Sequence, residues 1–341
     1  MSEARILVGD ARVRLSELAD GSVQTCVTSP PYFGLRDYGH GDQMGLEPTP
    51  GEYVKGMVAL FREVRRVLAD DGTLWLNLGD SYAASPKGSM AGQDKSNLTA
   101  TQSQEKSPVG IDKSKFGIAP KNLLGIPWRV AFALQADGWF LRQDIIWAKP
   151  NPMPESVTDR CTKSHEYLFL LTKSARYYCD MEAIAEPSIY GANGSEFDTG
   201  KTAGHQNYTM QPRDRRAGTG RLTYNGKRQG GDGEGQEAFV SMTDTRNKRD
   251  VWTIPTKPFR GAHFAVMPEA LVEPCVLAGS REYDTVLDPF AGSGTVGVVA
   301  LRHQRNFVGV ELNPQYAQMA RDRITDDAPM LNQVTISEVS P

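Results

Sequence analysis

The chain has 341 residues, 39% of them hydrophobic and 23% charged, and a formal net charge of −3, which is ordinary for a soluble globular protein with one large domain and an inserted module. No apolar stretch approaches the length of a membrane span and the N-terminal residues lack a signal-peptide layout, so we expect neither a membrane-spanning nor an exported protein. The four cysteines are scattered without a C-x-x-C pair, so we expect a reducing, cytoplasmic location and no metal site.

From the N-terminus onward, strand-like and helix-like segments alternate, which is typical of an α/β domain. Strands are predicted at Arg5–Val8, Thr25–Thr28, Thr73–Leu78, Leu141–Trp147, Tyr167–Thr172, Thr285–Leu287 and Asn306–Val310. Helices are predicted at Gly51–Leu68, Pro127–Asp137, Pro268–Leu277, Thr295–Arg302 and Pro314–Arg323. Residues near 82–120 and 186–248 show no convincing periodicity for either element.

Two polar segments concentrate positive charge on an otherwise acidic chain. Ser85–Lys121 holds six lysines against three acids, and Lys201–Arg228 holds seven lysines and arginines against one acid. Both are poor in apolar residues, which is typical of solvated, mobile loops. The same charge also suits a surface that engages a phosphate backbone and becomes ordered on contact. Composition alone leaves both interpretations open.

A stiff turn follows the second predicted strand, where the chain reads Ser29-Pro30-Pro31-Tyr32. Paired prolines exclude a helix and cannot lie in a central strand of a sheet. The turn therefore holds a serine and an aromatic ring in place just past a strand end. Taken alone, this pattern is also compatible with a rigid turn that bears a surface tyrosine.

The clearest local pattern lies near the C-terminus, where YDTVLDPFAGSGTVGVVALRHQRNFVGVEL reads as strand, glycine-containing loop, helix, strand and acid. In doubly wound folds the loop after the first strand approaches a nucleotide closely, and an acid after the second strand accepts bonds from ribose hydroxyls. The loop reads D-P-F-A-G-S-G-T, which is neither the G-x-G-x-x-G of a dehydrogenase nor a lysine-containing phosphate loop. A tight strand-to-helix turn without a ligand is the alternative.

Only one predicted helix and a short tail follow Glu311, so the other strands of such a sheet must come from the N-terminal half of the chain. We therefore predict a Rossmann-like, doubly wound, mostly parallel sheet that is circularly permuted. Ligands in open α/β sheets bind outside the carboxyl ends of the strands. The polar residues that follow predicted strands at these ends are Asp10, Ser29, Asp80, Asp288 and Glu311. We expect them to share one site, although any one of them can instead cap a helix or make a turn.

TSPPY together with DPFAGSGT resembles the S-adenosylmethionine-dependent DNA amino-methyltransferases in their permuted β-type order, in which the catalytic motif precedes the cofactor motif. The resemblance covers most of the chain outside the two polar segments, including GTLWLNLGDSY, IIWAKPNPMPESVTDRCTKSHEYLFLLTKS and DVWTIPTKPFRGAHFAVMPEALVEPC. It implies a catalytic tetrad at Ser29, Pro30, Pro31 and Tyr32. It implies that S-adenosylmethionine is bound by Asp10, Asp288, Phe290, Gly292, Gly294, Thr295, Glu311, His263 and Phe264.

The residue types of the tetrad suit methyl transfer to an exocyclic amino group. Such a group is conjugated with its ring and is a poor nucleophile, so it must be held in line with the methyl sulfonium while its protons are accepted. Ser29 Oγ and the Pro30 carbonyl are two acceptors that the prolines hold still. The base must flip out of the duplex, where Tyr32 can stack on it. The family usually carries Ser at the first tetrad position for cytosine N4 and Asp or Asn for adenine N6, so Ser29 favours cytosine N4, with adenine N6 as the alternative.

Three other functions fit the sequence less well. Cytosine C5 methylation needs a cysteine nucleophile, but Pro274-Cys275 lies in a predicted helix among apolar neighbours, as a core cysteine does. A catalytically inactive DNA-binding protein has no need of an intact tetrad and cofactor loop. RNA or protein-glutamine methyltransferases can use a proline-proline-tyrosine motif, but the basic segments and the permuted order favour DNA.

The expected organisation is one catalytic domain formed by residues 1–180 and 250–330, with a mobile basic loop at about 82–120, a target-recognition insert at 181–249 and a tail at 331–341. Basic residues of the insert are expected to contact DNA, mostly at phosphates: Arg213, Arg215, Arg216, Arg221, Lys227 and Arg228. The implied partner is double-stranded DNA, and a cognate restriction endonuclease is compatible with it. The protein is expected to be prokaryotic or phage-encoded and cytoplasmic, as a monomer or a homodimer.

Overall fold

The computed structural model describes residues 2–35, 40–83, 117–188, 245–256, 266–328 and 333–337. The chain divides into two compact units, one formed by Met1–Ile184 with Arg249–Pro341 and the other by Ala185–Lys248. In the second unit the described residues include the antiparallel pair β6 (Glu186–Pro187) and β7 (Thr245–Arg246). The six insert residues expected to contact DNA lie outside the described residues, as do His263, Phe264 and most of the basic loop at 82–120, so their roles stay predictions.

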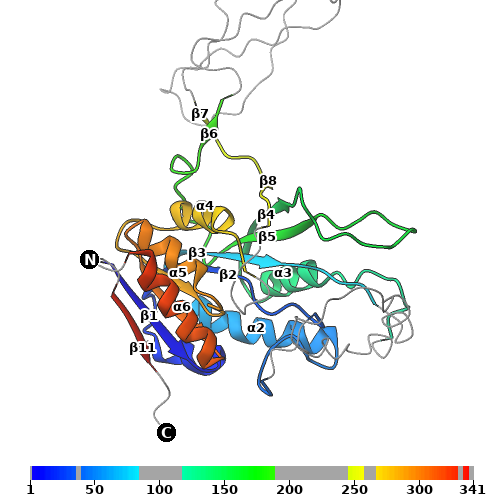
Figure 1. Ribbon diagram of the computed structural model, residues 1–341, viewed down its shortest axis with the longest axis horizontal. Coiled ribbons are helices and arrows are strands. Elements are labelled where there is room, and N and C mark those ends of the chain that lie inside the picture. The colour runs from blue at the N-terminus through cyan, green and yellow to red at the C-terminus, as the bar shows by residue number, and fades with distance from the viewer. Residues whose placement is uncertain are drawn as a thin grey trace, which may run out of the picture. The chain divides into compact units, whose positions relative to one another are not determined.

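A nine-stranded sheet forms the centre of the first unit (Figure 1). Its strands are β1 (Glu3–Val8), β2 (Val23–Thr28), β3 (Leu68–Leu78), β4 (Phe140–Ala148), β5 (His165–Thr172), β8 (Val251–Thr253), β9 (Thr285–Asp288), β10 (Asn306–Glu311) and β11 (Gln333–Ser337). Their order across the sheet is β11-β1-β10-β9-β2-β3-β5-β4-β8. β5 runs antiparallel to both of its neighbours, and the other pairs are parallel. The predicted mostly parallel α/β sheet is confirmed.

The strand–helix–strand segment that carries the expected cofactor loop lies near the middle of this sheet. β9 is followed by α5 (Thr295–Arg302) and then by β10, which lies toward β1, whereas β2 is followed by α2 (Pro50–Val67) and then by β3 on the opposite side. β9 and β2 pair directly with each other. The strand order therefore reverses between them, and an open α/β sheet has its ligand crevice at such a reversal. The circular permutation predicted from the sequence is confirmed.

Helices cover both faces of the sheet (Figure 1). One core lies against α1 (Ala11–Arg14), the 3-10 turn η1 (Leu15–Glu17), α2 and α3 (Ile126–Ala136). The other core lies against α4 (Glu269–Gly279), α5 and α6 (Pro314–Asp327). Successive side chains of a strand point to opposite faces, so Cys26 of β2 belongs to the first core and Val27 to the second. All six residues of β2 are buried, as expected for a central strand covered on both faces.

The longest helix, α2, shows how the local sequence sets its ends. The Thr49 side chain caps the N-terminus by accepting from the Glu52 backbone N–H at 3.2 Å, and Pro50 occupies the first turn. Arg65 and Arg66 lie in the last turn, where positive charge interacts favourably with the helix dipole. Within the described part of the chain, no helix combines the length and the apolar character needed to cross a membrane.

Two strands of the sheet were not predicted from the sequence. β11 lies inside the expected tail at 331–341 and pairs in parallel with β1, and its Val334 and Ile336 pack against the second core. β8 has three residues and pairs with β4 at the other edge. Both are short edge strands, and a run of three to five residues with one or two inward apolar side chains gives little periodicity. Residues 333–337 are therefore part of the sheet.

Candidate active site

A cavity of about 1200 Å³ opens at the carboxyl ends of β2, β9 and β10. It is lined by all five polar residues that the sequence places after strand ends: Asp10, Ser29, Asp80, Asp288 and Glu311. The other residues of the expected tetrad and most of the expected cofactor loop line it too: Pro30, Pro31, Tyr32, Phe290, Gly292 and Thr295. The structure therefore brings together two motifs that the sequence separates by more than 250 residues.

A hydrogen bond joins the two motifs where their strands end. The Thr28 hydroxyl donates to Asp288 Oδ1 at 2.7 Å, and the Phe290 backbone N–H donates to the same oxygen at 3.0 Å. Asp288 is 2% exposed, and burial raises its pKa to about 7 although these two hydrogen bonds lower it. The nearby charge of Glu311 raises it further. Because Ser29 directly follows Thr28, this contact fixes the serine close to the loop that follows β9.

Glu311 accepts backbone hydrogen bonds from the loops that follow β9 and β10. Its Oε2 accepts from the Gly292 N–H at 2.8 Å and its Oε1 accepts from the Asn313 N–H at 2.9 Å. Burial raises the pKa of Glu311, and the backbone hydrogen bonds oppose that rise. Each carboxylate oxygen can accept more than one hydrogen bond. Glu311 therefore retains acceptor capacity toward the cavity that it lines.

Two of the strand-end acids also cap helices. Asp10 Oδ1 accepts from the Arg12 backbone N–H at 2.8 Å at the start of α1, and its carboxylate pairs with the Arg12 guanidinium. Burial tends to raise the pKa of Asp10, but the contacts with Arg12 lower it below its usual value. Asp80 Oδ1 accepts from the backbone N–H groups of Ser81 at 2.9 Å and Ile126 at 3.1 Å, which holds the start of α3. The capping role and a place in the cavity wall thus coexist in both residues.

The rigid turn after β2 is held by hydroxyl groups from the protein interior. The Tyr53 hydroxyl of α2 donates to the Pro31 carbonyl at 2.9 Å. Tyr32 is half-buried, and its hydroxyl donates to Glu166 Oε2 at 2.6 Å. Burial, together with the charge of Glu166, raises the pKa of Tyr32 well above its usual value. The interpretation as a simple surface tyrosine is therefore wrong, because this side chain is anchored at both its ring and its hydroxyl.

The polar residues of this wall that the sequence analysis missed include Asn77, Lys149 and Glu166. They lie at the ends of β3, just past β4 and near the start of β5, respectively. A signal was present, because each is a polar residue that borders a strongly apolar strand in NLGD, WAKP and SHEY. The sequence does not show the order and direction of the strands, so these residues could not be assigned to one cavity. In the structure β5 runs antiparallel to β3 and β4, which brings its first residues to the edge where those two strands end.

One residue expected in the cofactor loop, Gly294, does not line the cavity. It has φ 76° at the start of α5, and a Cβ at this position would lie 2.9 Å from Ala320 Cβ of α6. A glycine is needed there for a left-handed backbone and for close helix contact. Its position therefore supports a packing role and not direct cofactor contact.

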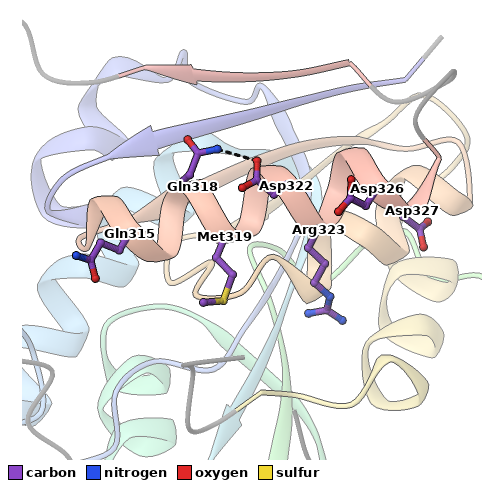
Figure 2. A pocket seen from close by; sticks show the side chains of 7 residues that line it. All are labelled: Gln315, Gln318, Met319, Asp322, Arg323, Asp326 and Asp327. Atoms are coloured by element: carbon purple, nitrogen blue, oxygen red, sulfur yellow. Dashed lines mark hydrogen bonds between the residues drawn. The ribbon is translucent and has the colours of Figure 1, made fainter. Parts of the chain in front are cut away.

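Arg323 of α6 ties the loop after β9 to two helices. Its Nη1 donates to the Thr295 hydroxyl at 2.8 Å and to the Ser293 hydroxyl at 3.2 Å, and its Nη2 donates to Glu269 Oε1 of α4 at 3.0 Å. Figure 2 shows Arg323 projecting from the same side of α6 as Met319. The shallow hollow of about 690 Å³ along this helix is lined by none of the strand-end residues.

The cysteines lie apart from this cavity. Cys275 is buried in α4, where its thiol donates to the Leu271 carbonyl at 3.2 Å, and Cys26 is buried within β2. Burial raises the pKa of the Cys26 thiol well above its usual value, with a further contribution from the charge of Asp288. Neither residue lines the cavity. Their positions fit core cysteines and do not support a cysteine nucleophile for C5 methylation.

Comparison with known proteins agrees with this arrangement. The "DNA methylase" family model for N6/N4 enzymes matches residues 23–322. The chain is 44% identical to Type II methyltransferase M.Cfr9I of Citrobacter freundii, over 95% of this chain and 88% of that protein. It is also 44% identical to Type II methyltransferase M.SmaI of Serratia marcescens, over 95% of this chain and 91% of that protein.

Solved structures share the fold at low sequence identity. A putative DNA modification methylase of Thermus thermophilus, complexed with S-adenosyl-L-methionine, aligns with a TM-score of 0.58 and 23% identity, over 99% of both chains. PvuII DNA methyltransferase (cytosine-N4-specific) aligns with a TM-score of 0.58 and 17% identity, over 97% of this chain and 93% of that one. From the family match over most of its length and the close Type II relatives, this chain belongs to the N6/N4 family of DNA methyltransferases.

Proposed function

We propose that the protein transfers a methyl group from S-adenosylmethionine to the N4 amino group of a cytosine flipped out of duplex DNA. The observation that carries the proposal is the placement of Ser29, at the end of β2, in the same cavity as the loop Asp288–Thr295. The former residue brings an acceptor for an amino group, and the latter segment brings the nucleotide-binding turn of a doubly wound sheet. The cavity volume of about 1200 Å³ has room for a cofactor and a base together.

The residues around the turn after β9 fit S-adenosylmethionine by their donor and acceptor chemistry. Glu311 is the last residue of β10, the second strand of the β9–α5–β10 segment, and in this fold class an acid at that place accepts from ribose hydroxyls. Asp10 and Asp288 add acidic oxygens to the wall, which suit the positive charges of the cofactor's amino group and sulfonium. Phe290 adds an aromatic face that can lie against a cation. When bound, the cofactor supplies the methyl group from its sulfonium.

The tetrad provides what an exocyclic amino group needs. Ser29 Oγ and the Pro30 carbonyl are acceptors in the wall, so they can hold the amino protons and leave the nitrogen aimed at the methyl group. The two prolines and the Tyr53–Pro31 hydrogen bond limit the motion of these acceptors. Tyr32 lines the same cavity and offers a ring on which a flipped base can stack.

Cytosine N4 is preferred over adenine N6 because the first tetrad position is Ser29 rather than Asp or Asn. The chemical difference between the two targets is small, since each amino group is attached to an aromatic ring and needs the same in-line geometry. Adenine N6 therefore remains the second candidate, on the same fold and with the same acceptors.

The reaction is tested by incubating the protein with methyl-labelled S-adenosylmethionine and mixed DNA, followed by digestion to nucleosides and mass spectrometry. The expected product is N4-methyldeoxycytidine. N6-methyldeoxyadenosine alone would overturn the cytosine assignment, and tight cofactor binding without any transfer would favour an inactive DNA-binding protein.

Ser29→Ala is expected to lose transfer while binding the cofactor normally. Competition with RNA tests the choice of nucleic acid.

The insert at 181–249 is proposed as the target-recognition region, and its support is the basic charge of residues 201–228. A cognate restriction endonuclease is proposed as a functional partner because the relatives named above are Type II methyltransferases. Long-read sequencing of DNA from cells that express the protein gives the modified base and its sequence context together.

A further inference from the structure

Two residues of the expected tetrad, Ser29 and Tyr32, belong to a hydrogen-bond network that ends on the carboxylate of Glu166. The Ser29 hydroxyl donates to the Tyr32 hydroxyl at 3.3 Å, and the Tyr32 hydroxyl donates to Glu166 Oε2 at 2.6 Å. Asn77, which is 1% exposed, donates through Nδ2 to the Tyr32 hydroxyl at 2.8 Å and to Glu166 Oε2 at 3.0 Å. All four residues line the cavity.

The carboxylate of Glu166 sets the direction of the hydrogen bonds in this network. An ionised carboxylate has no proton to give, so Glu166 can only accept. Burial and the charge of Glu166 raise the pKa of Tyr32 well above its usual value, so the phenol keeps its proton and donates it to Glu166. The Tyr32 oxygen is then left to accept, and the Ser29 hydrogen points toward it. Asn77 Nδ2 also donates to Ser29 Oγ at 3.4 Å, so Ser29 Oγ presents one lone pair, and not a hydrogen, to the cavity.

The Glu166 end of this hydrogen-bond network is fixed by an ion pair and by packing. Lys149 Nζ bonds Glu166 Oε1, and the side chains of both residues are less than a fifth exposed, at 17% and 15%. Lys149 Nζ also lies 4.3 Å from the centre of the Trp147 ring. The Tyr32 ring packs directly on the backbone of Gly79, where an added Cβ would lie 2.6 Å from Tyr32 Cε2. These contacts prevent the tyrosine from turning its hydroxyl away from Glu166.

We propose that Glu166 is a positioning residue for methyl transfer: by accepting from Tyr32, it orients Ser29 Oγ as a hydrogen-bond acceptor for the target amino group. This inference rests on the proposed function, because an amino group is the donor that such an acceptor meets. With the opposite direction of donation, Ser29 would point its hydrogen at the amino group and could not accept from it.

A double-mutant cycle with Tyr32→Phe and Glu166→Gln tests the proposal. The amide of Glu166→Gln can donate to the Tyr32 hydroxyl and reverse the direction of the hydrogen bonds in this network, whereas Tyr32→Phe keeps the ring and removes the link. Each single variant is expected to slow single-turnover methyl transfer about 10- to 100-fold, as for a misoriented reacting group, with cofactor affinity unchanged. The double variant is expected to be no slower than Tyr32→Phe, because without the hydroxyl the carboxylate has nothing to orient.

The matched control is Glu63→Gln, which removes a carboxylate paired with Arg66 on α2, outside the cavity, and is expected to keep the wild-type rate. The proposal would be overturned if the rate loss of the double variant equalled the product of the two single losses, or if Glu166→Gln kept the wild-type rate. If Glu166→Gln lowers the melting temperature by more than about 5 °C, the same cycle is run with Lys149→Met in every member, which removes the unpaired charge. A wild-type protein that methylates no DNA would instead overturn the proposed function.

Discussion

At the scale of single residues, the unusual group is the carboxyl of Asp288. It is buried at the junction of β2 and β9, and two donors, the Thr28 hydroxyl and the Phe290 N–H, share one of its oxygens. Burial raises its pKa to about 7 against 3.8 for an ordinary aspartate, and the charge of Glu311 adds to that rise. The free protein thus holds an acid that is costly to ionise beside a site proposed to receive a cation, so cofactor binding and ionisation of Asp288 should favour each other.

Asp288→Asn is expected to change how stability depends on pH. Because the folded pKa lies above the unfolded one, the stability that Asp288 contributes is complete below pH 3.8 and is lost as the pH rises through 7. Asparagine stays neutral and keeps an oxygen for Thr28 and Phe290. Each pKa unit corresponds to about 1.4 kcal/mol, so cofactor-free Asp288→Asn should gain up to ~4 kcal/mol over wild type at pH 8, and less toward pH 5.

Urea unfolding of the cofactor-free protein at pH 5 and pH 8 measures this difference. The control is Asp70→Asn, which changes a fully exposed aspartate side chain on β3. The control should differ from wild type by a similar amount at both pH values. A pH-independent difference for Asp288→Asn would contradict the expected role of burial.

At the scale of elements, α6 supports the loop after β9 through Arg323 (Figure 2). Ser293 and Thr295 are only 3% and 4% exposed, so their hydroxyls depend on protein partners. Arg302 of α5 binds both Glu269 of α4 and Asp327 of α6, and Arg323 also binds Glu269. The three helices are therefore joined by one ionic network on the side of the sheet that carries the loop.

Arg323→Met is expected to loosen this loop. The variant keeps an apolar stem but leaves the hydroxyls of Ser293 and Thr295 without the guanidinium, which costs about 1–3 kcal/mol for buried groups that lose a partner. We expect a lower melting temperature and weaker binding of S-adenosylhomocysteine, measured by differential scanning fluorimetry and calorimetric titration. The control is Arg321→Met on the same helix, at an exposed position. Equal effects of the two variants would argue against a specific role for Arg323.

At the scale of the whole molecule, charge is divided between an acidic body and two basic segments. A phosphate backbone is attracted to such segments, and each phosphate contact adds to the salt dependence of binding. The wall of the cavity described above contains several acids, so it is not by itself a surface for DNA. We propose that the basic segments supply part of the positive charge that DNA binding needs.

Arg213→Ala and Arg216→Ala are expected to weaken DNA binding and to leave cofactor affinity unchanged. The slope of log K against log salt should become less steep by about one for each lost phosphate contact. Fluorescence anisotropy over a range of salt concentrations gives the slope, and titration with S-adenosylhomocysteine gives the cofactor affinity. Arg62→Ala, which changes an exposed arginine paired with Asp137, is the control. Equal loss of both affinities would contradict a role in DNA binding.

The strands and helices of the core could be predicted from sequence because their periods are local properties. β2, β3, β9 and β10 were each predicted within five residues of their observed ends, and α5 at both ends. Short elements at the edges were not, because β8 and β11 owe their structure to neighbours that the local pattern does not show. The double role of Asp10 and Asp80 as caps and cavity residues likewise needed the structure.

The permuted order could be predicted from the sequence because too few predicted strands follow Glu311 to complete a sheet, and the resemblance carried by TSPPY and DPFAGSGT indicated the family. The hydrogen-bond partners of Ser29 and Tyr32 could be found only in the folded chain. Periodicity tells which face of a strand is buried, but not which strand lies beside it or in which direction that strand runs. The antiparallel direction of β5 brings Glu166 to the edge where β2 and β3 end, and there it meets Tyr32 across 134 residues of sequence.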